Sequence, residues 1–124
     1  MKIADKKTLS VLMTALYVAK WESDDDNAHV AAITGSPFFA RLYHDVVDEV
    51  VRLDASKPAA VRRWESWRAI EGRPDQLERT KARIRSMSPW SSWSREERLQ
   101  MIEYLLSPFR ATAATLDELV SLSP

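Results

Sequence analysis

The sequence predicts an all-α fold, a single-domain bundle of five to six helices with short connections. Apolar residues recur at helical spacing along most of the chain, which is the main signal for helices. The 124 residues include only two glycines, Gly35 and Gly72, too few for the many tight turns of an all-β meander. The length suits one core, and 45% hydrophobic residues fit a folded chain, so residues 1–124 are predicted to form one helical domain.

The first helix is expected over residues 5–22. Its main apolar row follows the i, i+3, i+4, i+7 pattern and consists of Leu9, Leu12, Met13 and Leu16. A second row is formed by Val11, Ala15 and Val18. Because a helix that is apolar on two faces is usually covered on both, we expect this helix to lie centrally in the bundle. The apolar run 9–19 is too short to span a bilayer, and no membrane partner is predicted.

Polar capping residues predict where the next two helices begin. Asp24, Asp25, Asp26 and Asn27 are N-cap candidates for a short helix over 28–33, which Gly35 would end. Ser36 and Pro37 open the clearest helix, since serine suits the N-cap and proline the first helical position. Its continuous apolar stripe consists of Phe39, Leu42, Tyr43, Val46, Val50 and Leu53.

Further helix signals follow in the second half. Pro58 and Pro74 open the third and fourth helices, and Ser94 with Glu97 forms a capping-box pair for the fifth. Pro108 ends that helix. A second capping-box pattern, Thr115 with Glu118, is expected to open a short final helix. The core is predicted to contain Leu12, Leu16, Phe39, Leu42, Val46, Val50, Trp64, Ile84, Leu99, Ile102, Leu106 and Leu119.

A net charge of zero hides charge blocks along the chain. Residues 22–54 carry a strong acidic excess, and residues 55–98 hold eleven basic against six acidic side chains. Such blocks either neutralise each other within the fold or form opposite poles that face different partners.

The segment 86–94 is serine-rich and carries Trp90 and Trp93, close to several arginines. Aromatic and guanidinium side chains are enriched at protein interfaces. We therefore expect the contact surface for a partner to consist of Trp90, Trp93, Arg83, Arg85, Arg95 and Arg98. The competing interpretation is that these indoles fold back onto the core, because an indole buries a large apolar area.

Nucleic acid is the alternative partner, and segment 55–98 would bind it. Arginine suits phosphate, and nearby indoles can stack on bases. However, the overall isoelectric point is near 6.7, whereas a dedicated nucleic-acid binder is usually clearly basic.

Catalytic and metal-binding patterns are scarce. The chain has no cysteine and two histidines, with no nucleophile elbow and no phosphate-cradling glycine loop. His44 with Asp48 and His29 could in principle supply metal ligands, but no zinc motif supports them. We predict that the protein is not an enzyme and has neither cofactor nor metal.

These observations together predict a small interaction protein that acts by stoichiometric binding to another protein, as an inhibitor, an immunity-type factor or a regulatory adaptor. A homodimer is possible, since narrow apolar stripes leave surface to cover. The lack of cysteine fits a cytoplasmic location.

Overall fold

The computed structural model describes residues 5–54 and 56–123, and this part of the chain is all-α, as predicted. The described residues form seven α-helices, one more than the upper prediction. They are α1 (Lys6–Tyr17), α2 (Ala28–Thr34), α3 (Pro37–Asp54), α4 (Pro58–Arg68), α5 (Pro74–Arg85), α6 (Arg95–Leu106) and α7 (Ala113–Val120). A π-helical turn η1 (Val18–Glu22) extends α1, and two 3-10 segments, η2 (Ile70–Gly72) and η3 (Ser88–Ser92), connect later helices.

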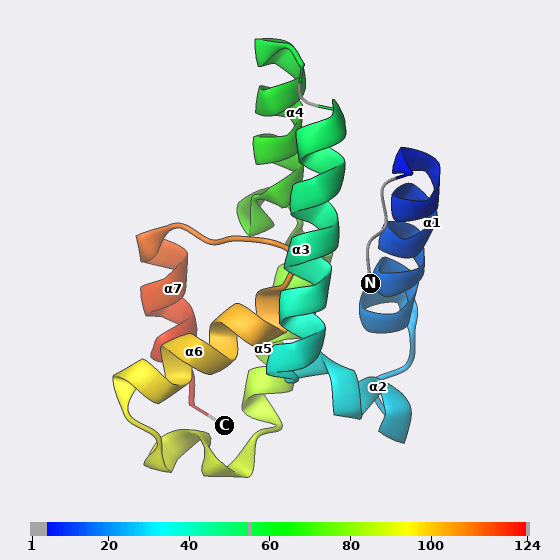
Figure 1. Ribbon diagram of the computed structural model, residues 1–124. Coiled ribbons are helices and arrows are strands. Elements are labelled where there is room, and N and C mark those ends of the chain that lie inside the picture. The colour runs from blue at the N-terminus through cyan, green and yellow to red at the C-terminus, as the bar shows by residue number, and fades with distance from the viewer. Residues whose placement is uncertain (1–4, 55, 124) are drawn as a thin grey trace.

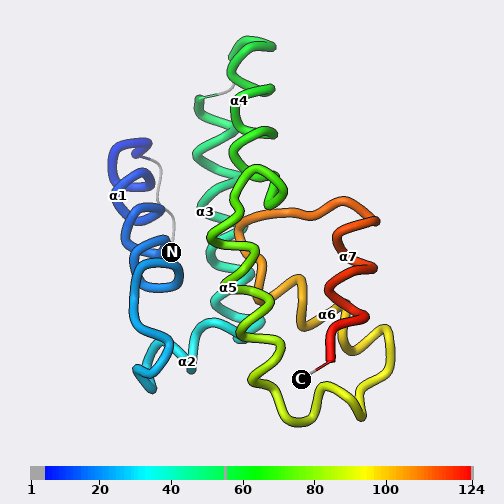
Figure 2. Tube along the Cα trace, turned by 180° about the vertical axis from the view of Figure 1, so that it is seen from behind, coloured from blue at the N-terminus to red at the C-terminus, as the bar shows by residue number. Residues whose placement is uncertain are grey.

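Helix α3 occupies the centre of the molecule. Figure 1 shows α1 on one side of it and α6 and α7 on the other, while α4 folds back beside its C-terminal end. In the view from behind, α5 lies in front of α3 (Figure 2). The arrangement follows from the sequence of α3, because Tyr43, Val46, Val47 and Val50 are all buried. These residues form one buried face of the helix, and α1, α2, α4 and α6 all contact α3.

Helix α1 is peripheral, and the expectation that it lies centrally is wrong. Leu9 and Leu16 are buried, and α1 packs mainly against α3. The second apolar row faces solvent, with Val11 67% and Val18 44% exposed. The central position belongs to α3, so only one of the two apolar faces of α1 is covered.

Side-chain caps begin several helices, and two of the predicted end signals are found where the sequence indicated them. Asn27 caps α2, and Gly35 follows its last residue. The Ser94 hydroxyl accepts from the Glu97 N–H, and the Glu97 carboxylate accepts from the Ser94 N–H, which is the predicted capping box. The predicted start of the last helix is wrong. Thr112 is the N-cap of α7 and accepts from the N–H of Thr115, so Thr115 lies inside the first turn.

The core lies around α3, α5 and α6. Seven of the predicted core residues are buried, namely Leu16, Val46, Val50, Ile84, Ile102, Leu106 and Leu119. Leu12, Phe39, Trp64 and Leu99 are half-buried against that core. Leu42 is 43% exposed and its assignment to the core is wrong, since the buried face of α3 is centred on Tyr43 and Val47, which point away from Leu42.

Candidate functional site

The serine-rich segment around η3 turns its indoles inward. Trp90 is fully buried, and Trp93 is half-buried with its ring centroid 5.9 Å from that of Trp90. The Arg98 guanidinium lies 5.7 Å from the centroid of the Trp90 ring. The prediction that Trp90 forms a contact surface is therefore wrong. The physical reason is the size of the indole, whose burial removes a large apolar area from water.

Two arginines of that predicted surface are also structural. Arg83 is buried, and its guanidinium donates to Asp25 and to the carbonyl of Lys20, so the prediction that it faces a partner is wrong. Arg98 donates to the carbonyls of Trp90, Ser91 and Val120. Arg95 is exposed and forms an ion pair with Asp117, and Arg85 is exposed. The accessible part of the predicted surface is reduced to Arg85, Arg95 and one side of Trp93.

The acidic and basic blocks of the sequence meet inside the fold. The Asp25 carboxylate receives Arg79 at 3.1 Å and Arg83 at 3.0 Å. Burial alone would raise the pKa of Asp25, but the hydrogen bonds from these two guanidinium groups lower it. Arg79 and Arg83 belong to α5, and a third basic residue of that helix, Lys81, pairs with Glu118 at 2.8 Å. The acidic block 22–54 and the basic block 55–98 thus neutralise each other in part, through Asp25 and through the pair of Asp48 with Arg68.

Lys20 is the most unusual buried residue, and nothing in its local sequence predicts that it is buried. Its ammonium nitrogen donates to the carbonyls of Tyr104 (2.8 Å) and Ser107 (2.7 Å) and to the hydroxyl of Ser107 (2.6 Å). Burial, followed by the charge of Arg83, holds its pKa well below the ordinary lysine value. Three acceptors match the three N–H donors of an ammonium group. Lys20 therefore ties the end of α1 to the end of α6 and is not available to a ligand.

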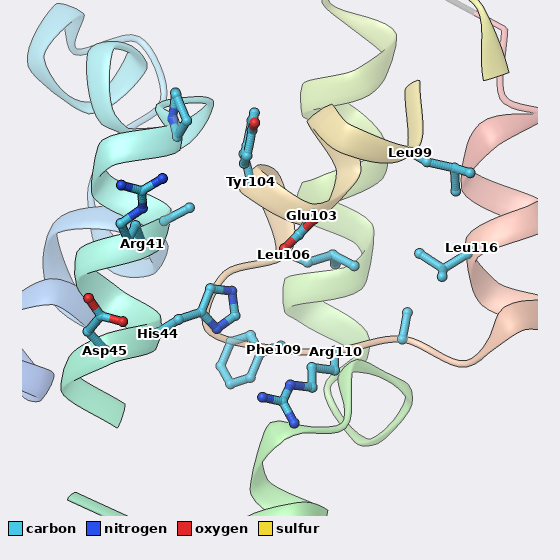
Figure 3. A pocket seen from close by; sticks show the side chains of 13 residues that line it. Arg41, His44, Asp45, Leu99, Glu103, Tyr104, Leu106, Phe109, Arg110 and Leu116 are labelled. Atoms are coloured by element: carbon cyan, nitrogen blue, oxygen red, sulfur yellow. The ribbon is translucent and has the colours of Figure 1, made fainter. Parts of the chain in front are cut away.

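A groove open to solvent lies between α3, α6, α7 and the chain that joins α6 to α7. Its volume is about 860 Å³, within the range of ligand pockets. The lining residues are Pro37, Ala40, Arg41, His44, Asp45, Leu99, Glu103, Tyr104, Leu106, Phe109, Arg110, Ala111 and Leu116. Figure 3 shows side chains from α3 on one wall and Leu99 and Leu116 on the opposite side. The groove thus has an apolar part and a rim with charges of both signs.

Two features of the chain position the charged rim. Helical spacing places Arg41, His44 and Asp45 on one side of α3. Arg110 is held by backbone pairing, since its N–H donates to the Arg68 carbonyl (2.7 Å) and its carbonyl accepts from the Ile70 N–H (2.9 Å). This short parallel pairing fixes the extended chain after Pro108 against the end of α4. Arg110 and His44 consequently approach the same end of the groove (Figure 3).

His44 is held neutral by its neighbours. Its Nδ1 lies 3.2 Å from Arg68 Nη2, and because a guanidinium only donates, Nδ1 must accept and Nε2 carries the hydrogen. Burial, followed by the charge of Arg68, lowers the pKa of His44. Arg68 is itself fixed by Asp48 (2.6 Å) and by the Pro108 carbonyl (3.2 Å). His44 can therefore donate one hydrogen bond to a ligand, while its basic nitrogen is already engaged.

Two further features were searched for in residues 5–54 and 56–123, namely a cluster of metal ligands and a membrane-spanning helix. Within these ranges no three histidine, aspartate or glutamate side chains converge as a metal site would require. The combination of His29, His44 and Asp48 is accordingly not formed. Across the same ranges no helix combines the length and apolar character needed to cross a bilayer.

The sequence contained only part of the signal for this groove. The i, i+4 spacing of Arg41 with Asp45 and of His44 with Asp48 marks one polar side of α3. Nothing in the local sequence indicates that Arg68, Arg110 and Leu116 meet it, because those contacts depend on how distant helices pack. Comparison with protein-family models, with curated proteins and with solved structures finds no match to this chain.

Proposed function

We propose that this chain is a small non-catalytic interaction protein that binds an amphipathic segment of a partner protein in the groove between α3, α6 and α7. The single observation that carries the proposal is the groove itself, with its volume of about 860 Å³ and its mixed apolar and charged lining. Amphipathic helices commonly dock by laying an apolar face into such a groove.

The lining matches a protein segment better than a strongly charged polymer. Leu99, Leu106 and Leu116 offer apolar contact to aliphatic or aromatic side chains of a partner. Arg41 and Arg110 carry positive charge, and Asp45 and Glu103 negative charge. A rim of balanced charge suits a segment that carries both signs, and charge placement of this kind favours specificity over bulk affinity.

An exposed apolar pair on α3 extends the proposed binding surface beyond the groove. Phe38 is 81% exposed and Leu42 is 43% exposed. They are four residues apart, and Arg41 and Asp45 follow Phe38 at i+3 and i+7, so all four share one side of the helix. A phenylalanine left this open is the kind of aromatic anchor that interfaces favour.

Nucleic-acid binding is less well supported, because most basic side chains of segment 55–98 contact other groups of the protein. Of the eleven basic residues in segment 55–98, seven are engaged within the described structure: Arg68, Arg73, Arg79, Lys81, Arg83, Arg95 and Arg98. Phosphate binding requires basic side chains that are free to neutralise a backbone. Lys57, Arg62, Arg63 and Arg85 remain exposed, which is a small set for that purpose.

The environment of His44 favours binding over general-base catalysis. A histidine base needs a free ring nitrogen toward the substrate and a partner that stabilises the imidazolium. Here Nδ1 accepts from Arg68, and the positive charge of Arg68 disfavours the imidazolium form. We infer a role as inhibitor or regulatory adaptor, and we propose the cytoplasm as its compartment because the chain has no cysteine.

The test is a selection of helical peptides that bind the intact protein, followed by titration of variants with the selected peptides. We expect Phe38→Ser and Arg110→Glu each to weaken binding by about tenfold, equivalent to roughly 1.4 kcal/mol. The matched controls lie on α4, where Val61→Ser and Arg62→Glu alter an exposed apolar and an exposed basic side chain. Equal affinities for all five proteins, wild type included, would exclude the groove as the binding site.

A further inference from the structure

A second apolar surface lies on α1, away from the groove. Leu9 and Leu16 face α3 and are buried. On the other side of the same helix Val11, Ala15 and Val18 are exposed, with Val11 the more open of the two valines. These three positions are spaced i, i+4 and i+7, so they form one continuous strip along the helix. Figure 1 shows α1 at the edge of the molecule.

Opposite charges mark the two ends of this strip. Lys7, four residues before Val11, is exposed at the beginning of α1. Glu22, four residues after Val18, is exposed at the end of η1. The order along the helix is therefore a cation, a valine, a pair of small residues at Thr14 and Ala15, a valine and an anion.

This order is symmetric about the midpoint between Thr14 and Ala15. Val11 and Val18 lie equally far from that point on either side, and so do Lys7 and Glu22. A twofold axis through the midpoint would bring each valine against the other valine of a second copy. The same axis would bring Lys7 of each copy against Glu22 of the other, so the strip is self-complementary in both shape and charge.

We propose that α1 is a homodimerisation surface on which two copies pair antiparallel around Thr14 and Ala15. The small side chains at the crossing point let the two helix backbones approach closely, while the valines pack on either side of it. The two valine contacts lie roughly 10 Å apart along the helix, given a rise of 1.5 Å per residue. An interface one helix wide is at the small end for stable complexes, so the dimer is weak and concentration-dependent.

The first test is sedimentation equilibrium of the full chain over a wide range of protein concentration at low salt. We expect the mass to rise from the 14.2 kDa of one chain toward twice that value. Val11→Asp should abolish the rise without loss of helical circular dichroism. Val61→Asp on α4, also an exposed valine, should leave it unchanged. A wild-type protein that stays monomeric at every concentration, or a Val11→Asp variant that still dimerises, would overturn the proposal.

A charge swap tests the antiparallel register. Lys7→Glu and Glu22→Lys should each weaken association, because each places like charges opposite one another in both symmetry-related pairs. The double variant restores opposite charges and should recover the wild-type dissociation constant. A double variant as weak as either single variant would contradict this register. The groove variant Arg110→Glu should dimerise normally, which keeps this proposal separate from that of partner binding in the groove.

Discussion

The serine-rich segment around η3 and the first half of α3 both carry aromatic residues, but the most exposed aromatic side chain lies in the helix. Trp90 in η3 is fully buried, whereas Phe38 in α3 is 81% exposed. The serine-rich composition predicts exposure for Trp90, and the predicted apolar stripe of α3 does not include Phe38. Neighbouring residues therefore decide exposure, because Arg98 packs over the Trp90 ring whereas Phe38 lies on the exposed side of α3.

The arginines show the same contrast between buried and exposed side chains. Arg79 and Arg83 of α5 are drawn inward by Asp25, while Arg95 pairs with Asp117 at the surface. The presence of an acidic partner does not distinguish them, since Arg79, Arg83 and Arg95 each pair with an aspartate. What separates them is the burial of the guanidinium, which determines how much of the interaction water can replace.

The largest expected effect separates Trp90 from Phe38. Trp90→Ala should lower the free energy of unfolding by about 3–5 kcal/mol, because it leaves a large cavity in the core. Phe38→Ala should change it by about 0.5 kcal/mol or less, as at ordinary surface positions. Urea unfolding followed by circular dichroism measures both. Similar losses for the two variants would contradict the assigned burial.

The arginine comparison gives an intermediate effect. Arg83→Ala should cost about 1–3 kcal/mol, because it leaves the buried Lys20 carbonyl without its donor and removes the group that stacks on Trp21. Arg95→Ala should cost at most about 0.5 kcal/mol, since both members of its ion pair are exposed. Denaturation midpoints of the two variants, measured side by side, check this. A larger loss for Arg95→Ala would reverse the comparison.

A smaller effect is expected from pH. The pKa of folded His44 lies below its ordinary value of 6.5, because burial and Arg68 disfavour the charged form. The unfolded chain therefore binds more protons as the pH falls below about 6.5, so the stability contributed above that pH is lost on acidification. The free energy of unfolding should fall between about pH 7 and pH 5, and His44→Gln should reduce that slope. An unchanged slope in His44→Gln would show that another group causes it.

Local rules predicted the elements of this fold well, because caps and spacing act over a few residues. Ser94 with Glu97, Pro58 and Pro74 each begin a helix where the sequence indicated. The predicted start at Thr115 failed because Thr112, three residues earlier, also offers a hydroxyl to an N–H. Two equivalent capping residues in one stretch leave the boundary ambiguous.

The candidate site was much less predictable. The sequence spacing predicts a pair of His44 with Asp48, but the hydrogen-bond partner of His44 is Arg68, twenty-four residues away in the sequence. Arg110 reaches the groove only because the chain after α6 pairs with the end of α4. Lys20 reads as an ordinary surface lysine at the end of a helix, and only the packing of α1 against the end of α6 reveals its three acceptors. Such contacts depend on tertiary packing, which helical periodicity does not encode.

The most direct test of binding in the groove is backbone NMR of the labelled protein during titration with a selected peptide. We predict the largest shift changes in the first half of α3, in α6 and in residues 109–116, with little change in the segment 88–95. Changes concentrated in 88–95, around Trp93 and Arg95, and absent from α3 would show that binding occurs on the tryptophan-containing segment, which would contradict the assignment of the groove.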